Sequence, residues 1–161
     1  MRLSLILPAF CLAALPATVQ AQVEIHTPWV RATVPQQQAT GAFFSLVSPV
    51  AAKLVAARSP IAGRVELHTI QIQGEVMSMR PISEIPLPAN EVVNLAPGGA
   101  HLMLLELKTS LKAGEQAPLI LVVEDEKGER KEYPLTAEVR PLDAPSPTLQ
   151  GQHEHRHEQK N

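Results

Sequence analysis

The chain has 161 residues, of which 45% are hydrophobic and 19% charged, and its formal net charge is −2 at pH 7. Because this charge is small and the Lys and Arg residues form no run, the sequence gives no indication of binding to nucleic acid or to an anionic membrane surface. The only cysteine is Cys11, so an intramolecular disulfide is excluded.

Residues 1–21 have the pattern of a secretory signal peptide. Arg2 provides a positive charge, and residues 3–15 form an apolar run that is too short to span a bilayer, which needs about 20 apolar residues. Residues 19–21 supply a cleavage site, so we expect cleavage after Ala21 and a periplasmic protein with no membrane insertion. The residues before the cysteine lack the small residue that precedes a lipid-modified one, so lipidation is not expected. Cleavage removes the thiol and leaves a net charge of −3.

Residues 22–140 are predicted to form a single all-β domain. Short apolar runs alternate there with prolines and turn residues, and helical periodicity is hard to find. The regular spacing favours a sandwich or barrel, with candidate strands at 23–26, 29–33, 42–47, 54–57, 65–72, 76–80, 91–95, 101–107, 118–124 and 130–139. Turn residues at 125–128 predict a hairpin between the last two strands. Residues 141–161, rich first in proline and then in histidine, are expected to be a disordered tail.

The methionines that remain after cleavage are confined to one part of the chain. They are Met77, Met79 and Met103, and the same segment holds His68 and His101. Side chains two residues apart on a strand share a face, so His101 and Met103 project together about 7 Å apart, and Met77 and Met79 do the same. A neutral thioether is a poor ligand for zinc, calcium or magnesium and a good one for copper(I). We therefore predict a Cu(I) site made by His68, Met79, His101 and Met103, with a possible auxiliary role for Met77.

The same residues can be considered for zinc binding, protein binding, electron transfer and catalysis. Zinc could bind if Glu66, on the same strand face as His68, joined the histidines, but the methionines would then have no role. A metal-free β-sandwich that binds another protein is also open. An electron-transfer cupredoxin requires a cysteine thiolate, which the cleaved chain lacks. An enzyme is not predicted, because Ser78 and Ser83 have no recognisable nucleophile context and few histidines remain for acid–base work.

Further histidines lie outside the predicted Cu(I) site. His153, His155 and His157 alternate with charged residues in the tail, and imidazoles this close together chelate divalent copper, nickel or zinc. The tail is therefore either an auxiliary Cu(II) site or a solvated polar segment. His26 lies near the new amino terminus, where it could assist Cu(II) binding, although a plain surface role is favoured.

The spacing of the four predicted ligands resembles that of a known family. Ten residues separate His68 from Met79, twenty-one separate Met79 from His101, and one separates His101 from Met103. This pattern matches the motif of the periplasmic PCu(A)C copper chaperones. The surrounding segments 65–69, 77–81 and 97–104 are similar to that family, as are 29–32 and 41–44, so the resemblance covers about residues 23–139.

The resemblance implies a cupredoxin-like Greek-key β-sandwich with an exposed Cu(I) site. It also implies delivery of the ion to the dinuclear copper centre of a respiratory oxidase subunit. We further expect a monomer, with another periplasmic copper chaperone as the alternative recipient. Ile70 stands where many members of the family have a further methionine, so one accessory sulfur is absent.

Overall fold

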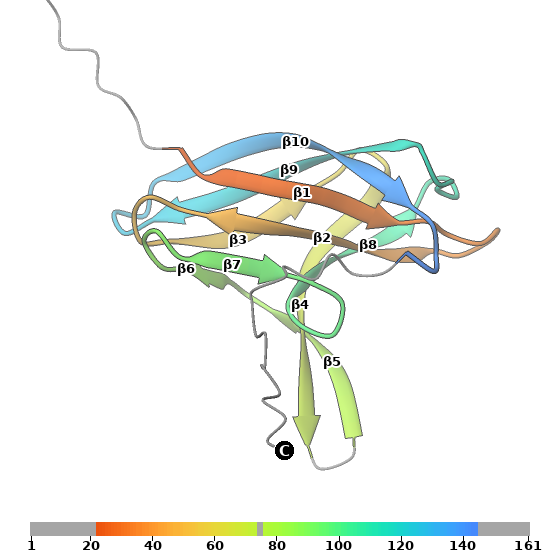
Figure 1. Ribbon diagram of the computed structural model, residues 1–161, viewed down its shortest axis with the longest axis horizontal. Helices are drawn as coiled ribbons and strands as arrows, with labels where there is room; N and C mark the ends of the chain where they lie inside the picture. The colour runs from red at the N-terminus through yellow and green to blue at the C-terminus, as the bar shows by residue number, and fades with distance from the viewer. Residues whose placement is uncertain (1–21, 74–75, 145–161) are drawn as a thin grey trace, which may run out of the picture.

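The computed structural model describes residues 22–73 and 76–144, which form ten β-strands and no helix. Figure 1 shows their arrangement. The strands are β1 (Glu24–Arg31), β2 (Ala39–Val47), β3 (Ala52–Arg58), β4 (Ala62–Gln73), β5 (Val76–Ile82), β6 (Ile85–Leu87), β7 (Val92–Leu95), β8 (His101–Leu107), β9 (Gln116–Asp125) and β10 (Arg130–Arg140). The predicted all-β class is confirmed.

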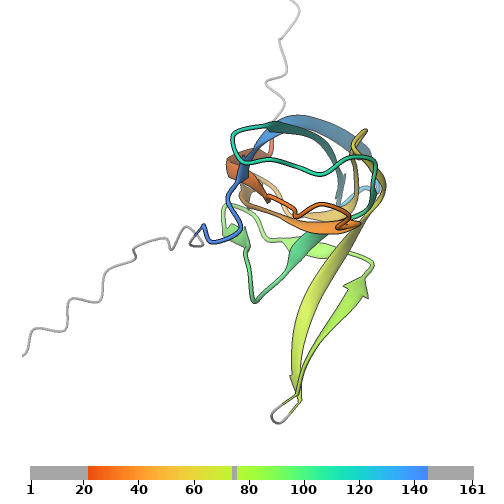
Figure 2. The ribbon, with the colours of Figure 1, turned by 90° about the vertical axis from the view of Figure 1, so that its right-hand side faces the viewer.

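The strands form one continuous sheet in the order β5-β4-β8-β2-β1-β10-β9-β3-β6, with β7 paired to β2. Neighbouring strands are antiparallel except β1 and β10, which pair in parallel near the two ends of the described chain. The sheet folds over on itself, so that the body viewed end-on in Figure 2 is a ring of strands. The folded sheet therefore has two faces. Side chains on the inner face pack against one another, and the remaining side chains lie on the outer face.

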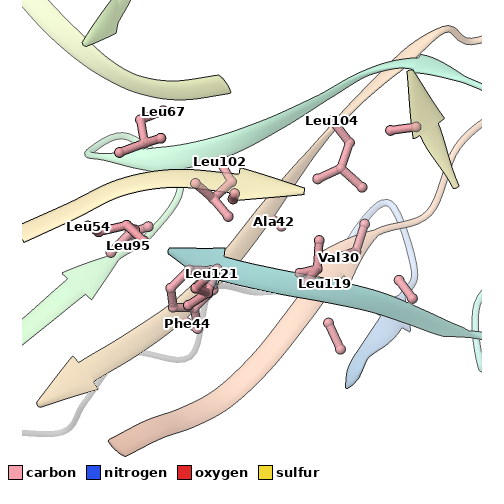
Figure 3. Packing of buried hydrophobic residues seen from close by; sticks show 14 of the residues in the cluster. Val30, Ala42, Phe44, Leu54, Leu67, Leu95, Leu102, Leu104, Leu119 and Leu121 are labelled. Atoms are coloured by element: carbon pink, nitrogen blue, oxygen red, sulfur yellow. The ribbon is translucent and has the colours of Figure 1, made fainter. Parts of the chain in front are cut away.

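The inner face holds the hydrophobic core. Leu102 and Leu104 of β8 and Leu119 and Leu121 of β9 are almost completely buried and pack in the same cluster (Figure 3). In each strand these residues are two apart, which is the spacing that puts both on one face. Burial of each such side chain stabilises the fold by about 1.5–3 kcal/mol.

Two strand predictions need correction. The predicted strands 23–26 and 29–33 are one strand, β1, which continues through an irregularity between His26 and Trp29 where Thr27 adopts a φ of 46°. The short β6 was not predicted, because an Ile-Pro-Leu segment has too few residues to establish an alternating pattern and contains a proline.

The predicted hairpin at 125–128 is confirmed, since β9 and β10 pair in antiparallel on either side of it. The Asp125 carboxylate accepts hydrogen bonds from the backbone N–H groups of Lys127 and Glu129 at 2.8 and 2.9 Å. Gly128 has a φ of 80°, a conformation that glycine adopts without a steric penalty. The turn therefore follows directly from local residue chemistry.

The β4 strand belongs first to the body and then to a projecting arm. Its residues from Ala62 to His68 pair with β8, whereas those from Leu67 to Gln73 pair with β5. Beyond His68, β4 and β5 continue together away from the ring of strands, as Figures 1 and 2 show. His68 consequently lies where the arm joins the body.

The predicted signal peptide and the predicted histidine tail lie outside the described residues, at 1–21 and 145–161. Cleavage after Ala21 and the role of the tail remain predictions. Within the described part of the chain, no helix is long and apolar enough to cross a membrane.

Candidate metal centre

Strand register brings the four predicted ligands to one face of the sheet. His68 of β4 is the direct antiparallel partner of His101 of β8. Met103 follows His101 by two residues, and Met79 of β5 is paired with Ile70, two residues after His68. Directly paired residues and residues two apart project to the same face. The predicted origin of the ligands from three neighbouring strands is therefore what the topology provides.

Three of these four residues line one cavity on the outer face. Met79, His101 and Met103 contribute to its walls, together with Arg31, Gly41, Phe43, Ile70, Pro97 and Gly98. His68 does not line the cavity, but its ring centroid lies 6.0 Å from that of His101, with an angle of 53° between the rings. A metal–imidazole bond of about 2 Å places an ion about 3 Å from the ring centre, so two rings that share an ion can lie up to about 6 Å apart. The observed separation fits a shared ion.

His101 is held in place by the backbone of the preceding loop. Its side chain is buried, and Nδ1 donates a hydrogen bond of 2.9 Å to the carbonyl oxygen of Gly99. This tautomer leaves Nε2 with its lone pair as a possible ligand atom. Burial lowers the pKa of His101 below its ordinary value, and nearby His68 lowers it further, while the hydrogen bond to Gly99 opposes the shift. His101 therefore favours the neutral state that a metal ligand needs.

His68 is oriented by a carboxylate. Its Nε2 donates a 2.8 Å hydrogen bond to Glu66 Oε2, and this bond, with a smaller contribution from Arg64, lowers the pKa of Glu66. Nδ1 of His68 is buried and has no hydrogen-bond partner among the described residues. A buried polar atom left unpaired costs about 1–3 kcal/mol. A bond from this nitrogen to a metal would remove that cost, so the donor set fits a metal.

The two methionines differ from the histidines in exposure. Met79 is 50% exposed and Met103 is partly exposed, whereas only 12% of the His68 side chain is accessible and His101 is buried. The imidazoles thus form the inner side of the candidate site, and the thioethers form its rim.

The family model described as "Putative lipoprotein LpqE-like" matches residues 23–137. The chain belongs to the LpqE-like lipoprotein family. It is also 30% identical over 122 residues to "Putative lipoprotein Lxx21020" of Leifsonia xyli, an alignment that covers 71% of this chain and 74% of the relative.

Solved structures that resemble this LpqE-like protein include PCuAC domains and CuI-DR1885. The copper-bound PCuAC domain from PmoF2 is 23% identical with a TM-score of 0.60, and the alignment covers 76% of this chain and 96% of that domain. CuI-DR1885 from Deinococcus radiodurans is 28% identical with a TM-score of 0.56, covering 77% of this chain and 83% of that protein. These matches confirm the predicted cupredoxin-like fold of the LpqE-like chain.

Sequence reasoning did not identify the residues that form the other wall of the cavity. Arg31 lies over Trp29 and Phe43, with its guanidinium carbon 6.0 and 5.7 Å from the two ring centroids. Gly41 is the register partner of Met103, and a Cβ atom built on it would lie 2.6 Å from the Phe43 ring. Alternation along β1 and β2 indicates the face on which Arg31 and Gly41 lie. It places them at the site only when β2 is known to lie beside β8 and β1 beside β2.

Of the predicted auxiliary residues, the two in the described part of the chain do not join this cavity. Met77, on β5, is 62% exposed. His26, on β1, is also exposed, and its Nε2 lies 3.4 Å from Glu24 Oε2. Neither residue lines the cavity. His153, His155 and His157 lie outside the described residues.

The zinc alternative required Glu66 to join the two histidines. Within residues 22–73 and 76–144, no group of three His, Cys, Asp or Glu side chains is arranged to hold a metal ion. In this LpqE-like protein Glu66 accepts a hydrogen bond from His68, and this contact orients the imidazole.

Proposed function

We propose that this protein is a copper chaperone that binds one Cu(I) ion through His68, Met79, His101 and Met103. The observation that carries the proposal is the register of β4, β5 and β8, which puts two imidazoles and two thioethers on one face, where Met79, His101 and Met103 line a cavity. Thioethers favour Cu(I) over zinc and other hard or borderline ions.

The proposed transfer proceeds by ligand exchange. The two histidines are held by Glu66 and Gly99 and keep the ion, while soft ligands of an acceptor replace the exposed thioethers one at a time. Copper stays in the +1 state throughout, and no proton moves with a thioether. Two weak neutral ligands at the rim suit a protein that releases its ion and catalyses no reaction.

The comparisons support copper as the cargo and the cell envelope as the location. One similar structure contains Cu(I), another is copper-bound, and the curated relative carries a lipoprotein name. We propose that the secreted chain works in the periplasm. The proposed acceptor is the dinuclear copper centre of a respiratory oxidase subunit or another copper chaperone, and the tail supplies an auxiliary Cu(II) site.

A competition titration with Cu(I) tests this proposal. The protein is titrated under reducing conditions against a chelator, and wild type is compared with the double variant Met79→Leu/Met103→Leu, which keeps apolar bulk and removes both sulfurs. We expect one tightly bound ion in wild type and an affinity at least about 100-fold lower in the double variant, on the basis of about tenfold for each lost ligand.

The matched control is Val50→Leu/Val92→Leu, which introduces two leucines at exposed positions outside the site. It should bind like wild type. Absence of Cu(I) binding by wild type, or equal binding by wild type and the double methionine variant, contradicts the proposed function.

A further inference from the structure

Two methionines are exposed on the β4–β5 arm. Met77 is 62% exposed and Met79 is 50% exposed. Burial of a methionine side chain normally stabilises a protein by about 1.5–3 kcal/mol, and at these positions most of that gain is absent. Met79 has a place in the proposed Cu(I) site, whereas Met77 lies outside the cavity. Packing therefore gives no reason for a large apolar side chain at position 77.

Register puts the two methionines on the same face of the arm. Met79 is paired with Ile70, and Met77 with Ile72, so both side chains project to the face that carries His68. Residues two apart on a strand are about 7 Å apart. A methionine side chain has three rotatable bonds, so two sulfurs at this spacing can converge on one ion.

Met79 and Met77 lie at different distances from the body along the arm. His68 lies at the junction with the body, Met79 lies close to it on β5, and Met77 lies one same-face position farther out. Figures 1 and 2 both show the arm projecting away from the ring of strands. An ion that leaves the cavity along the arm therefore meets the Met77 thioether after that of Met79.

We propose that Met77 and Met79 form an outer two-thioether station through which Cu(I) enters and leaves the four-ligand site. This inference rests on the proposed function. In the outward step, a bond forms between Met77 Sδ and the ion, and the bond from Met103 Sδ breaks, while Met79 and the two histidines stay attached. Ligands of the acceptor then replace Met79 and Met77 one at a time, and they replace the histidines last. Copper remains Cu(I), and the thioethers gain and lose no proton.

Removal of Met77 is therefore expected to change the rate of Cu(I) transfer without a matching change in Cu(I) affinity. Met77 is not one of the four proposed ligands that hold the ion before transfer begins. Its removal therefore leaves the dissociation constant for Cu(I) nearly unchanged. Met77 stabilises the ion during exchange, so its loss slows transfer. For Met77→Leu we expect a dissociation constant within about threefold of wild type and a transfer rate about tenfold lower.

Stopped-flow transfer of Cu(I) from the full secreted chain to a chromophoric Cu(I) chelator tests this prediction, with affinities measured by competition in the same buffer. Val92→Leu is the matched control, because it places the same side chain at another position that is more than half exposed. Met77→His is the rescue variant, since imidazole is also a Cu(I) ligand. Transfer should be slow only in Met77→Leu.

The outcomes separate this inference from the proposed function. Normal affinity with an unchanged transfer rate in Met77→Leu overturns the outer station and leaves the proposed function intact. A large loss of affinity in Met77→Leu also overturns it, because Met77 would then be one of the ligands that hold the ion before transfer begins. No Cu(I) binding by wild type overturns both.

Discussion

The four proposed ligand residues differ in how firmly their neighbours hold them. The imidazole of His101 is fixed by the Gly99 carbonyl, and that of His68 by the Glu66 carboxylate. Met79 is half exposed on an edge strand. Since ordering a side chain on binding costs conformational entropy, prepositioned imidazoles favour retention, and thioethers without such an orienting hydrogen bond favour exchange. Affinity should therefore be sensitive to the groups that orient the histidines.

Glu66 provides a test of this orienting role. Glu66→Ala removes the acceptor for His68 Nε2, and we expect Cu(I) affinity to fall about tenfold or more, as is usual for lost orienting partners of metal ligands. Glu66→Gln keeps an acceptor oxygen and should stay close to wild type. Glu106→Ala is the control, because Glu106 is an exposed carboxylate on β8 that pairs with Arg64. Equal affinities for Glu66→Ala and Glu106→Ala, measured by competition titration, would show that Glu66 does not position the ligand.

The lowered pKa of His101 predicts how the stability of the metal-free protein depends on pH. Burial holds this pKa below the ordinary value of 6.5. As the pH falls through 6.5, the unfolded chain binds a proton at His101 before the native protein does, so the free energy of unfolding decreases with decreasing pH until the native pKa is reached. Urea unfolding at pH 7.5 and pH 5 should show this loss. His101→Gln should reduce it, and an identical pH dependence in wild type and variant would refute the assignment.

Among the elements, β2 shapes the site without contributing a ligand. Gly41 pairs with Met103, and Phe43 packs on Trp29 with ring centroids 4.5 Å apart. Phe43 is buried, so its ring has little freedom to move away from a new side chain. The cavity beside Met103 thus depends on the absence of a side chain at position 41.

Gly41→Ala should therefore destabilise the fold. The added methyl group would lie 2.6 Å from the Phe43 ring, and overpacking of this kind typically costs about 1–3 kcal/mol. Chemical unfolding measures the change. Gly99→Ala is the control, because its Cβ would meet only the Ala96 carbonyl oxygen at 3.7 Å, and it should unfold close to wild type. A Gly41→Ala variant as stable as wild type would mean that the ring adjusts freely.

The elements also show what the sequence could and could not predict. Alternation and turn residues located most strands, and the His68–Met79–His101–Met103 spacing predicted a shared site on β4, β5 and β8. The cavity wall that contains Arg31 was not predicted from the sequence. Arg31 lies at the site because β1 pairs with β2 and β2 pairs with β8, and both pairings are non-local. Such pairings depend on topology, which local periodicity does not encode.

At the scale of the whole molecule, the proposed Cu(I) site lies in the folded domain, and the proposed Cu(II) site lies in the carboxy-terminal tail. The described strands end at Arg140, and the histidines of the tail follow well beyond it in sequence. A protein of this kind would hold the two oxidation states of copper in different places, with thioethers for Cu(I) and clustered imidazoles for Cu(II).

Truncation after Ala144 tests this separation. We expect the shortened protein to keep its Cu(I) affinity and to lose a Cu(II) binding step that the full secreted chain shows in calorimetric titration. A triple variant with His153, His155 and His157 replaced by Gln should behave like the truncation. Retained Cu(II) binding after truncation, or a loss of Cu(I) affinity, would contradict the proposed division.

In the proposed site, two imidazoles and two thioethers share one Cu(I) ion. X-ray absorption at the copper edge, measured on protein loaded with one equivalent under reducing conditions, identifies the neighbours of the ion. We expect a Cu(I) edge and a coordination shell with nitrogen and sulfur neighbours, and the sulfur contribution should disappear in Met79→Leu/Met103→Leu. A shell of nitrogen and oxygen alone in wild type would refute the shared site.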